Sequence, residues 1–194
     1  MALVIRKATL DDLDAVLAVG HRTWPATYEG IAGADYVQAG LAKWWSAEAT
    51  SPAIRQGRVT IAEVDGEVCG MASVGREEDH LVLWRLYVVP EHHGRGLGSA
   101  LLAAVLEEAD GRYAEIRLSY TEGNTPAAHF YRSRGFVETH HETGGGGVPD
   151  QVWMSRRVPQ RGAPVPHPSD TEPATAPVDP EPATAPVEPE GVQS

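Results

Sequence analysis

Cysteine is almost missing from this chain, since Cys69 is the only one among 194 residues. A single thiol excludes an internal disulfide framework and a zinc site built from several cysteines. It is compatible with a reducing compartment, and we expect a cytoplasmic protein. Cys69 stands between Val68 and Gly70 in an expected strand, which favours a buried structural thiol over a nucleophile.

Long apolar runs and basic residues are scarce as well. The sequence has no stretch of about 18 uninterrupted apolar residues, which a membrane-spanning helix would require. Arg6 and Lys7 interrupt the N-terminal segment too early for a signal peptide. Lys and Arg number 16 against 27 Asp and Glu, which gives a net charge of −11. We therefore expect neither a membrane nor a nucleic acid as partner, because nucleic acids are bound by basic faces.

Aromatic residues are absent from residues 159–194, which hold ten of the fifteen prolines and six acidic residues against one Arg. This segment contains a repeat of nine residues, EPATAPVDP at 172–180 followed by EPATAPVEP at 181–189. Such a composition buries too little apolar surface to offset the entropy of ordering it. The sequence therefore predicts a folded domain at 1–158 and a disordered, partly polyproline-II tail at 159–194. A docking peptide for a proline-binding partner is the alternative interpretation of the tail.

Residues 1–158 alternate between the periodicities of strands and helices. Thr9 precedes an acidic first turn and an apolar stripe, a pattern typical of a capped amphipathic helix. Asp65-Gly66 lies between two alternating segments and predicts a hairpin turn. We expect helices after Thr9 and at 34–49, 97–109 and 126–134, and strands at 3–8, 59–64, 68–74, 79–89, 115–120, 137–140 and 151–158. The expected fold class is α/β, with a mixed sheet flanked by helices.

A glycine-rich turn joins an expected strand to an expected helix in the segment LYVVPEHHGRGLGSALL, at 86–102. Glycine lets the backbone approach a ligand closely, and the N-terminus of a helix favours negative charge, so this turn suits a polyphosphate. A P-loop is excluded because the turn has no Lys, and a dinucleotide fingerprint would need a third glycine where Ser99 stands. The pyrophosphate of coenzyme A and a plain connecting turn remain as alternatives.

A second segment, NTPAAHFYRSRGF at 124–136, follows the first after one helix, one strand and one turn. Together the two segments resemble the GCN5-related N-acetyltransferase (GNAT) family. That family carries (Q/R)-x-x-G-x-(G/A), which spans His93 to Gly98 here, and N-x-x-A-x-x-(F/Y)-Y-x-x-x-G-F, which spans Asn124 to Phe136. The resemblance covers about residues 3–158, and His93 departs from it, because Gln or Arg is usual there.

The resemblance implies the GNAT acyl-CoA N-acyltransferase fold, whose splayed central strands, here 82–89 and 115–120, hold acetyl-CoA. Strand backbone groups would pair with the pantetheine arm, and the glycine-rich turn would hold the pyrophosphate. Asn124 would contact the pantetheine or adenosine portion while capping its helix. The expected cofactor-binding residues are Leu86, Tyr87, Val88, His93, Gly94, Arg95, Gly96, Leu97, Gly98, Ser99 and Asn124. No metal is expected.

The resemblance also implies direct transfer of the acetyl group from the thioester to a primary amine. Tyr131 matches the family position whose hydroxyl protonates the departing thiolate, with a core aromatic as the alternative interpretation. A phenol with a pKa of about 10 is a workable acid beside a thiol of about 8.5. The general base stays unassigned, because Ser119 stands where many members have Glu; a water chain, Glu29, His80 and Glu122 are candidates.

The sequence leaves the acceptor, a small-molecule or peptide amine, open among a small amine, an antibiotic, a protein N-terminus and a lysine. The family places its acceptor near residues 24–35 and 142–149 of this chain. Trp24, Tyr28 and Glu29 form an aromatic and acidic set suited to a cationic amine, with core packing of the aromatics as the alternative.

Two functions therefore stand at this point. The first is a cytoplasmic, acetyl-CoA-dependent N-acetyltransferase, for which a homodimer is an option because dimers are common in the family. The second is a non-catalytic acyl-CoA-binding regulatory module, favoured by Ser119 in place of the acid and opposed by Tyr131.

Overall fold

The computed structural model of the chain describes residues 2–77, 79–145 and 148–159. The predicted tail, apart from residue 159, lies outside the described residues, so the tail and the domain limit at 158 stay predictions. In chain order, the elements are β1 (Leu3–Lys7), the 3-10 turn η1 (Leu10–Asp12), α1 (Leu13–Trp44), α2 (Ala47–Arg55), β2 (Val59–Val64), β3 (Glu67–Arg76), β4 (His80–Val88), the 3-10 turn η2 (Pro90–His92), α3 (Leu97–Ala109), β5 (Glu115–Thr121), α4 (Thr125–Arg132), β6 (Val137–Glu142) and β7 (Gln151–Arg157).

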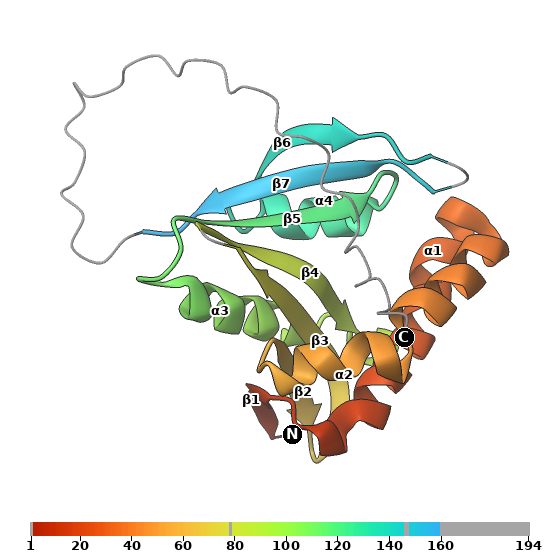
Figure 1. The fold of residues 1–194 in the computed structure, drawn as a ribbon, viewed down its shortest axis with the longest axis vertical. Helices are drawn as coiled ribbons and strands as arrows, with labels where there is room; N and C mark the ends of the chain where they lie inside the picture. The colour runs from red at the N-terminus through yellow and green to blue at the C-terminus, as the bar shows by residue number, and fades with distance from the viewer. Residues whose placement is uncertain (1, 78, 146–147, 160–194) are drawn as a thin grey trace, which may run out of the picture. The chain divides into compact units, whose positions relative to one another are not determined.

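Within the described residues, seven strands form one mixed sheet in the order β1-β2-β3-β4-β5-β7-β6 (Figure 1). β4 and β5 are parallel, and the other neighbouring pairs are antiparallel. The expected fold class and the expected hairpin are confirmed, since Asp65 and Gly66 adopt φ values of 49° and 90° at the turn between β2 and β3. No helix among the described residues combines the length and apolar character needed to cross a lipid bilayer.

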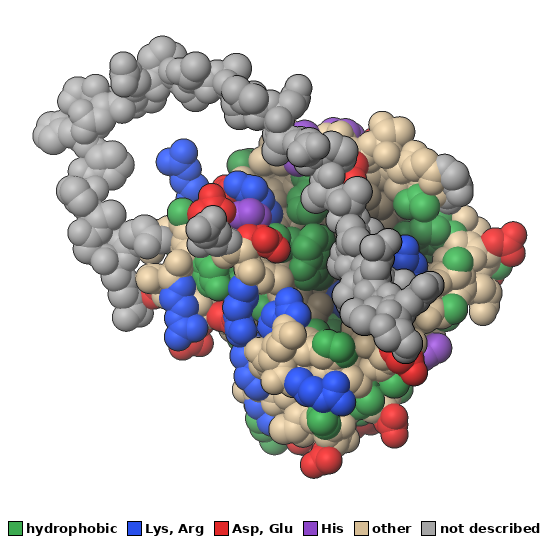
Figure 2. Space-filling model, in the orientation of Figure 1, with side chains coloured by type: hydrophobic (Ala, Val, Ile, Leu, Met, Phe, Trp, Pro, Cys, Tyr) green, Lys and Arg blue, Asp and Glu red, His purple; other side chains and the backbone are tan. Residues whose placement is uncertain are grey.

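Helices cover both faces of the sheet around β4. Tyr87 points toward α1 and its C-cap, where its ring meets Trp45 at a centroid distance of 5.4 Å. Leu86, the preceding residue, points the other way and lies beside Gly98 of α3. On that side, Lys7 and Arg76 both form ion pairs with Glu108 of α3, and Lys and Arg side chains gather around α3 in Figure 2. The two helical layers thereby fix β4 from both sides.

Although α1 spans Leu13–Trp44, the chain reverses direction within it. Gly33 breaks the helix with φ 83° and ψ 168°, a backbone conformation that favours glycine. Trp24 therefore meets Tyr36 and Trp44, at centroid distances of 5.9 Å and 5.4 Å. In an uninterrupted helix, Trp24 and Trp44 would lie about 30 Å apart. The expected separation into two helices is thus correct, whereas the first one runs further than expected.

The expected end of the second helix, at residue 49, is wrong. That helix ends at Trp44, and a separate helix, α2, begins after Ser46. The Ser46 hydroxyl accepts a hydrogen bond from the Ala49 N–H, at 3.2 Å, and so caps α2. Ala47 and Glu48 continue a helical pattern, so sequence periodicity does not reveal this boundary.

Two glycines allow tryptophan rings to touch a helix backbone directly. A Cβ atom at Gly40 would lie 2.0 Å from a ring carbon of Trp24, and one at Gly20 would lie equally close to Trp45. Real Cβ contacts are never that short, so any side chain at these positions would push the two helical segments apart. The close contact between Trp24 and Gly40 holds the two halves of α1 together.

Gly40→Ala is therefore expected to lower the free energy of unfolding by about 1–3 kcal/mol, the usual cost of overpacking. This is the reverse of the roughly 1 kcal/mol gain that Ala ordinarily brings to a helix. Gly30→Ala is the matched control, because a Cβ there meets no atom within 4 Å, and it should stabilise the protein. Urea unfolding followed by tryptophan fluorescence measures both variants. A stabilising Gly40→Ala would contradict the close approach.

Candidate active site

The parallel strands β4 and β5 separate part-way along their length (Figure 1). Their pairing ends at Leu83 and Leu118. Beyond this point β4 stays paired with β3 as far as Val88, and β5 stays paired with β7. Within the described part of the chain, residues 84–88 have no strand partner on the β5 side. Their backbone groups on that side can pair with an extended ligand.

An extra residue in β4 coincides with this separation. The register between β3 and β4 shifts between Ser73 and Val74, which leaves Trp84 as a bulge. A bulge bends its strand and increases the local twist, so β4 turns away from β5. The Trp84 indole lies over Gly75, where a Cβ would come within 2.3 Å of the indole nitrogen. The smallness of Gly75 therefore accommodates the bulged side chain.

The glycine-rich turn after β4 leads directly into α3. Gly94 and Gly96 have φ values of 74° and 85°, which favour glycine, and Gly96 is the N-cap of α3. Glycine has no side chain with which to cap the N–H groups of the first helical turn. These N–H groups remain free to bind an anion at the positive end of the helix dipole.

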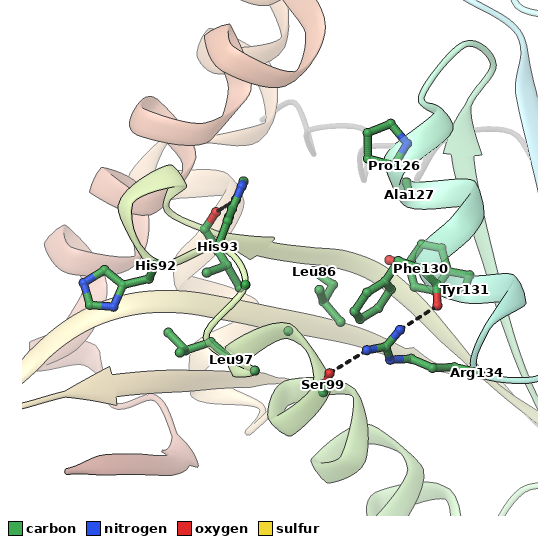
Figure 3. A pocket seen from close by; sticks show the side chains of 14 residues that line it. Leu86, His92, His93, Leu97, Ser99, Pro126, Ala127, Phe130, Tyr131 and Arg134 are labelled. Atoms are coloured by element: carbon green, nitrogen blue, oxygen red, sulfur yellow. Dashed lines mark hydrogen bonds between the residues drawn. The ribbon is translucent and has the colours of Figure 1, made fainter. Parts of the chain in front are cut away.

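A groove of about 450 Å³ lies along this turn, between β4 and α4; we call it the first groove (Figure 3). The predicted cofactor-binding residues that line it are Leu86, Val88, His93, Gly94, Gly96, Leu97, Gly98 and Ser99. Arg95, also predicted, is exposed and does not line it. The two motifs, although separate in sequence, thus border one groove.

Arg134 lines the first groove, and the sequence motifs did not single it out. Its guanidinium lies over the Phe130 ring, 3.7 Å from the centroid, and donates to the Ser99 hydroxyl (2.6 Å) and the Phe130 carbonyl (2.9 Å) (Figure 3). Among the described residues that line the groove, Arg134 alone carries a permanent charge. Its motif position accepts any residue, so only its place opposite the α3 N-terminus reveals it.

A second groove, of about 430 Å³, adjoins the first along the open edge of β4, and Tyr131 lines both. The Tyr131 ring packs between Phe130 and Phe136, with centroid distances of 5.2 Å and 5.7 Å, and only 8% of the residue is exposed. Desolvation raises the pKa of Tyr131 well above that of a free phenol. The hydroxyl of this residue, which lines both grooves, is therefore protonated at neutral pH.

The second groove is lined by Tyr28 of α1 and Tyr87 of β4, whose hydroxyls are hydrogen-bonded at 2.9 Å. Burial raises the pKa of both phenols. Asn124 also lines this groove, and its side-chain oxygen accepts a hydrogen bond from the Ala127 N–H at 3.2 Å. The predicted capping role of Asn124 is thus present in the structure.

Of the three predicted acceptor-binding residues, only Tyr28 lines a groove. Trp24 is 6% exposed and packs against Tyr36 and Trp44, so the core-packing interpretation describes it. Glu29 is exposed and borders neither groove. Residue type alone does not distinguish a core aromatic from a groove aromatic one helical turn away.

The candidate bases from the sequence lie outside both grooves. His80 stands at the start of β4, next to Asp79, at the end of the strand remote from Val88. Glu122 is exposed, with its carboxylate 3.7 Å from His141. Ser119 does line the second groove.

Comparison with known proteins agrees with this geometry. Residues 55–138 match the family model of the acetyltransferase (GNAT) domain. An uncharacterised N-acetyltransferase of Mycobacterium tuberculosis is 33% identical over 148 residues, which cover 69% of this chain and 94% of the relative. The chain belongs to the GNAT family. It is therefore an acyltransferase, and family membership does not favour the non-catalytic module.

Two further proteins are similar to this GNAT enzyme, one in sequence and one in structure. The spermidine N(1)-acetyltransferase of Thermoplasma acidophilum is 26% identical over 144 residues, covering 70% of this chain and 89% of that protein. The crystal structure of the PaiA N-acetyltransferase from Thermoplasma acidophilum in complex with coenzyme A has a TM-score of 0.71 at 24% identity, covering 81% of this chain and 99% of that one. The latter likeness shows that the fold is shared.

Proposed function

We propose that this enzyme moves the acetyl group of acetyl-CoA directly to a primary amine of a small molecule or peptide. The proposal rests above all on Tyr131, which lines both grooves. One groove has anion-binding features and the other has none, so two different ligands would meet beside a protonated phenol. The name of the Thermoplasma relative makes a polyamine one amine to test beside peptide amines.

The residues of the first groove fit coenzyme A. The uncapped N–H groups at the start of α3 and the Arg134 guanidinium both suit a pyrophosphate. The open edge of β4 offers backbone donors and acceptors to the amides of a pantetheine arm. The His93 Nε2 atom lies 2.7 Å from the Val88 carbonyl oxygen, to which it donates. This bond holds the glycine-rich turn against the end of β4, a positioning role for the residue that departs from the family motif.

Bound acetyl-CoA supplies an activated acetyl group whose transfer leaves a thiolate. Tyr131 would donate its proton to that sulfur as negative charge develops. Its raised pKa keeps the phenol protonated through neutral and moderately alkaline pH, so the donor is present over this whole range. Cys69 plays no part in this scheme, because it is 1% exposed and burial raises the pKa of its thiol.

Tyr131→Phe is expected to lower kcat by about 10²–10⁴, the usual contribution of a general acid, while the Kd for acetyl-CoA stays within about twofold. Release of free thiol measures turnover, and calorimetric titration measures binding. Tyr36→Phe is the matched control, because Tyr36 lies in the aromatic cluster with Trp24 and lines neither groove. An unchanged kcat for Tyr131→Phe would contradict the acid assignment, and loss of binding would indicate a packing role.

Arg134→Ala is expected to weaken coenzyme A binding about tenfold, since a charge-assisted contact contributes roughly 1.5 kcal/mol. Acetyl-pantetheine lacks the phosphates, so its binding should change little. Arg132→Ala is the matched control, because Arg132 pairs with Glu138 and lines neither groove. Equal losses for coenzyme A and acetyl-pantetheine would contradict a phosphate contact.

A further inference from the structure

The part of the second groove that the structure describes has no carboxylate, ammonium or guanidinium group on its walls. Among the described residues that line it, none is Asp, Glu, Lys or Arg; the titratable groups are His93, Tyr28, Tyr87, Tyr120 and Tyr131. Hydroxyl, amide and apolar groups make up the rest of its surface. An ammonium ion entering this groove would therefore lose water without gaining a carboxylate partner.

The four phenols do not act as bases at neutral pH. Burial is the largest cause that raises the pKa of each one above its ordinary value. The Tyr120 hydroxyl donates a hydrogen bond to the Glu138 carboxylate at 2.8 Å, and this bond holds the phenol in its protonated form. All four side chains therefore carry their protons when the acceptor arrives.

His93 is the remaining titratable group of the groove, and it is held at one end of it. Its Nε2 atom donates to the Val88 carbonyl beside the glycine-rich turn. In Figure 3, Leu86 lies between His93 and the pair formed by Phe130 and Tyr131. The imidazole thus stands on the side of the expected pyrophosphate site and not beside Tyr131.

The carboxylates around the second groove have other partners or lie outside it. Glu138 pairs with Arg132, Asp150 accepts the Gly144 N–H at 2.9 Å, and Glu142 accepts the indole N–H of Trp153 at 2.6 Å. Exposed carboxylates on α1 and on the loop after β5 do not line the groove. No carboxylate in the described part of the chain is therefore placed to take a proton there.

A groove without a base selects amines that are already neutral. The α-amino group of a peptide, with a pKa of about 7.7–8.0, is roughly one-tenth neutral at pH 7, whereas a lysine side chain, with a pKa of about 10.4, is neutral in roughly one molecule in 2,500. We propose that the acceptor is a weakly basic amine, typified by the α-amino group at the N-terminus of a peptide, and not a lysine side chain or a polyamine. This inference rests on the proposed function and names its acceptor class.

The test compares two peptides of one sequence with the full-length enzyme and acetyl-CoA. One has a free α-amine and an acetylated lysine; the other has an acetylated N-terminus and a free lysine; spermidine serves as the polyamine. At pH 7, kcat/KM for the free α-amine should exceed the other two by at least about 30-fold, which allows for the greater nucleophilicity of the more basic amines. The gap should narrow as pH rises toward 9.5. Equal or greater kcat/KM for lysine or spermidine at pH 7 would overturn the inference.

The pH profile separates an acceptor-controlled reaction from one with a protein base. The midpoint of kcat/KM against pH should follow the pKa of the amine across α-amines of different basicity. A midpoint that stays at one value for every acceptor would assign the titration to a group of the protein and overturn the inference. Calorimetric titration with acetyl-CoA distinguishes a failure of the proposed function from a failure of the proposed acceptor class. Absent binding contradicts the proposed function, whereas binding with a preference for the lysine amine contradicts only the acceptor class.

A gain of activity provides a second, independent test. Ser119→Glu would place a carboxylate on the wall of the second groove, and Ser119→Gln is the matched variant of the same size without the charge. Ser119→Glu should raise kcat/KM for the lysine peptide at pH 7 about tenfold over Ser119→Gln, because it supplies the missing base. Equal values for the two variants would show that deprotonation does not limit this groove and would overturn the inference.

Discussion

The separation of β4 from β5 beyond Leu83 is the constraint on which the site depends. A backbone N–H or C=O group without a partner destabilises a structure once water is excluded. Residues 84–88 therefore favour a ligand that can form hydrogen bonds along the open edge of β4. The Trp84 bulge accompanies this divergence, and the helical layers on the two faces keep β4 from relaxing back. A ligand with an extended, amide-containing chain can form these hydrogen bonds in the way an added strand does.

Charge is distributed unevenly around this edge, in contrast to the acidic chain as a whole. The first groove combines the α3 N-terminus with Arg134, whereas none of the described residues that line the second is Asp, Glu, Lys or Arg. A net charge of −11 therefore does not oppose an anionic ligand at the site, because local donors dominate at short range and distant charges are screened. The lack of a carboxylate among the described residues of the second groove limits what the enzyme can do for a protonated amine.

Tyr131 joins these two environments. Its burial between Phe130 and Phe136 fixes the ring, and the same burial holds its proton. The two adjacent aromatic residues of α4 therefore have different roles. The Phe130 ring packs against the Arg134 guanidinium, and Tyr131 lines both grooves. The burial of Tyr131 therefore accounts both for the fixed position of its ring and for its raised pKa.

The sequence by itself determined the order of the strands, the hairpin at Asp65-Gly66, the glycine-rich turn and the family, because these depend on local backbone preferences and short spacings. Only the tertiary structure decided that Trp24 is core while Tyr28 lines the groove, that α2 starts at Ser46 and that Arg134 faces α3. These outcomes depend on the reversal at Gly33, on strand register and on contacts between distant segments, such as the 35 positions that separate Ser99 from Arg134. Periodicity along a chain carries no information about which distant side chain fills a given space, and packing alone settles it.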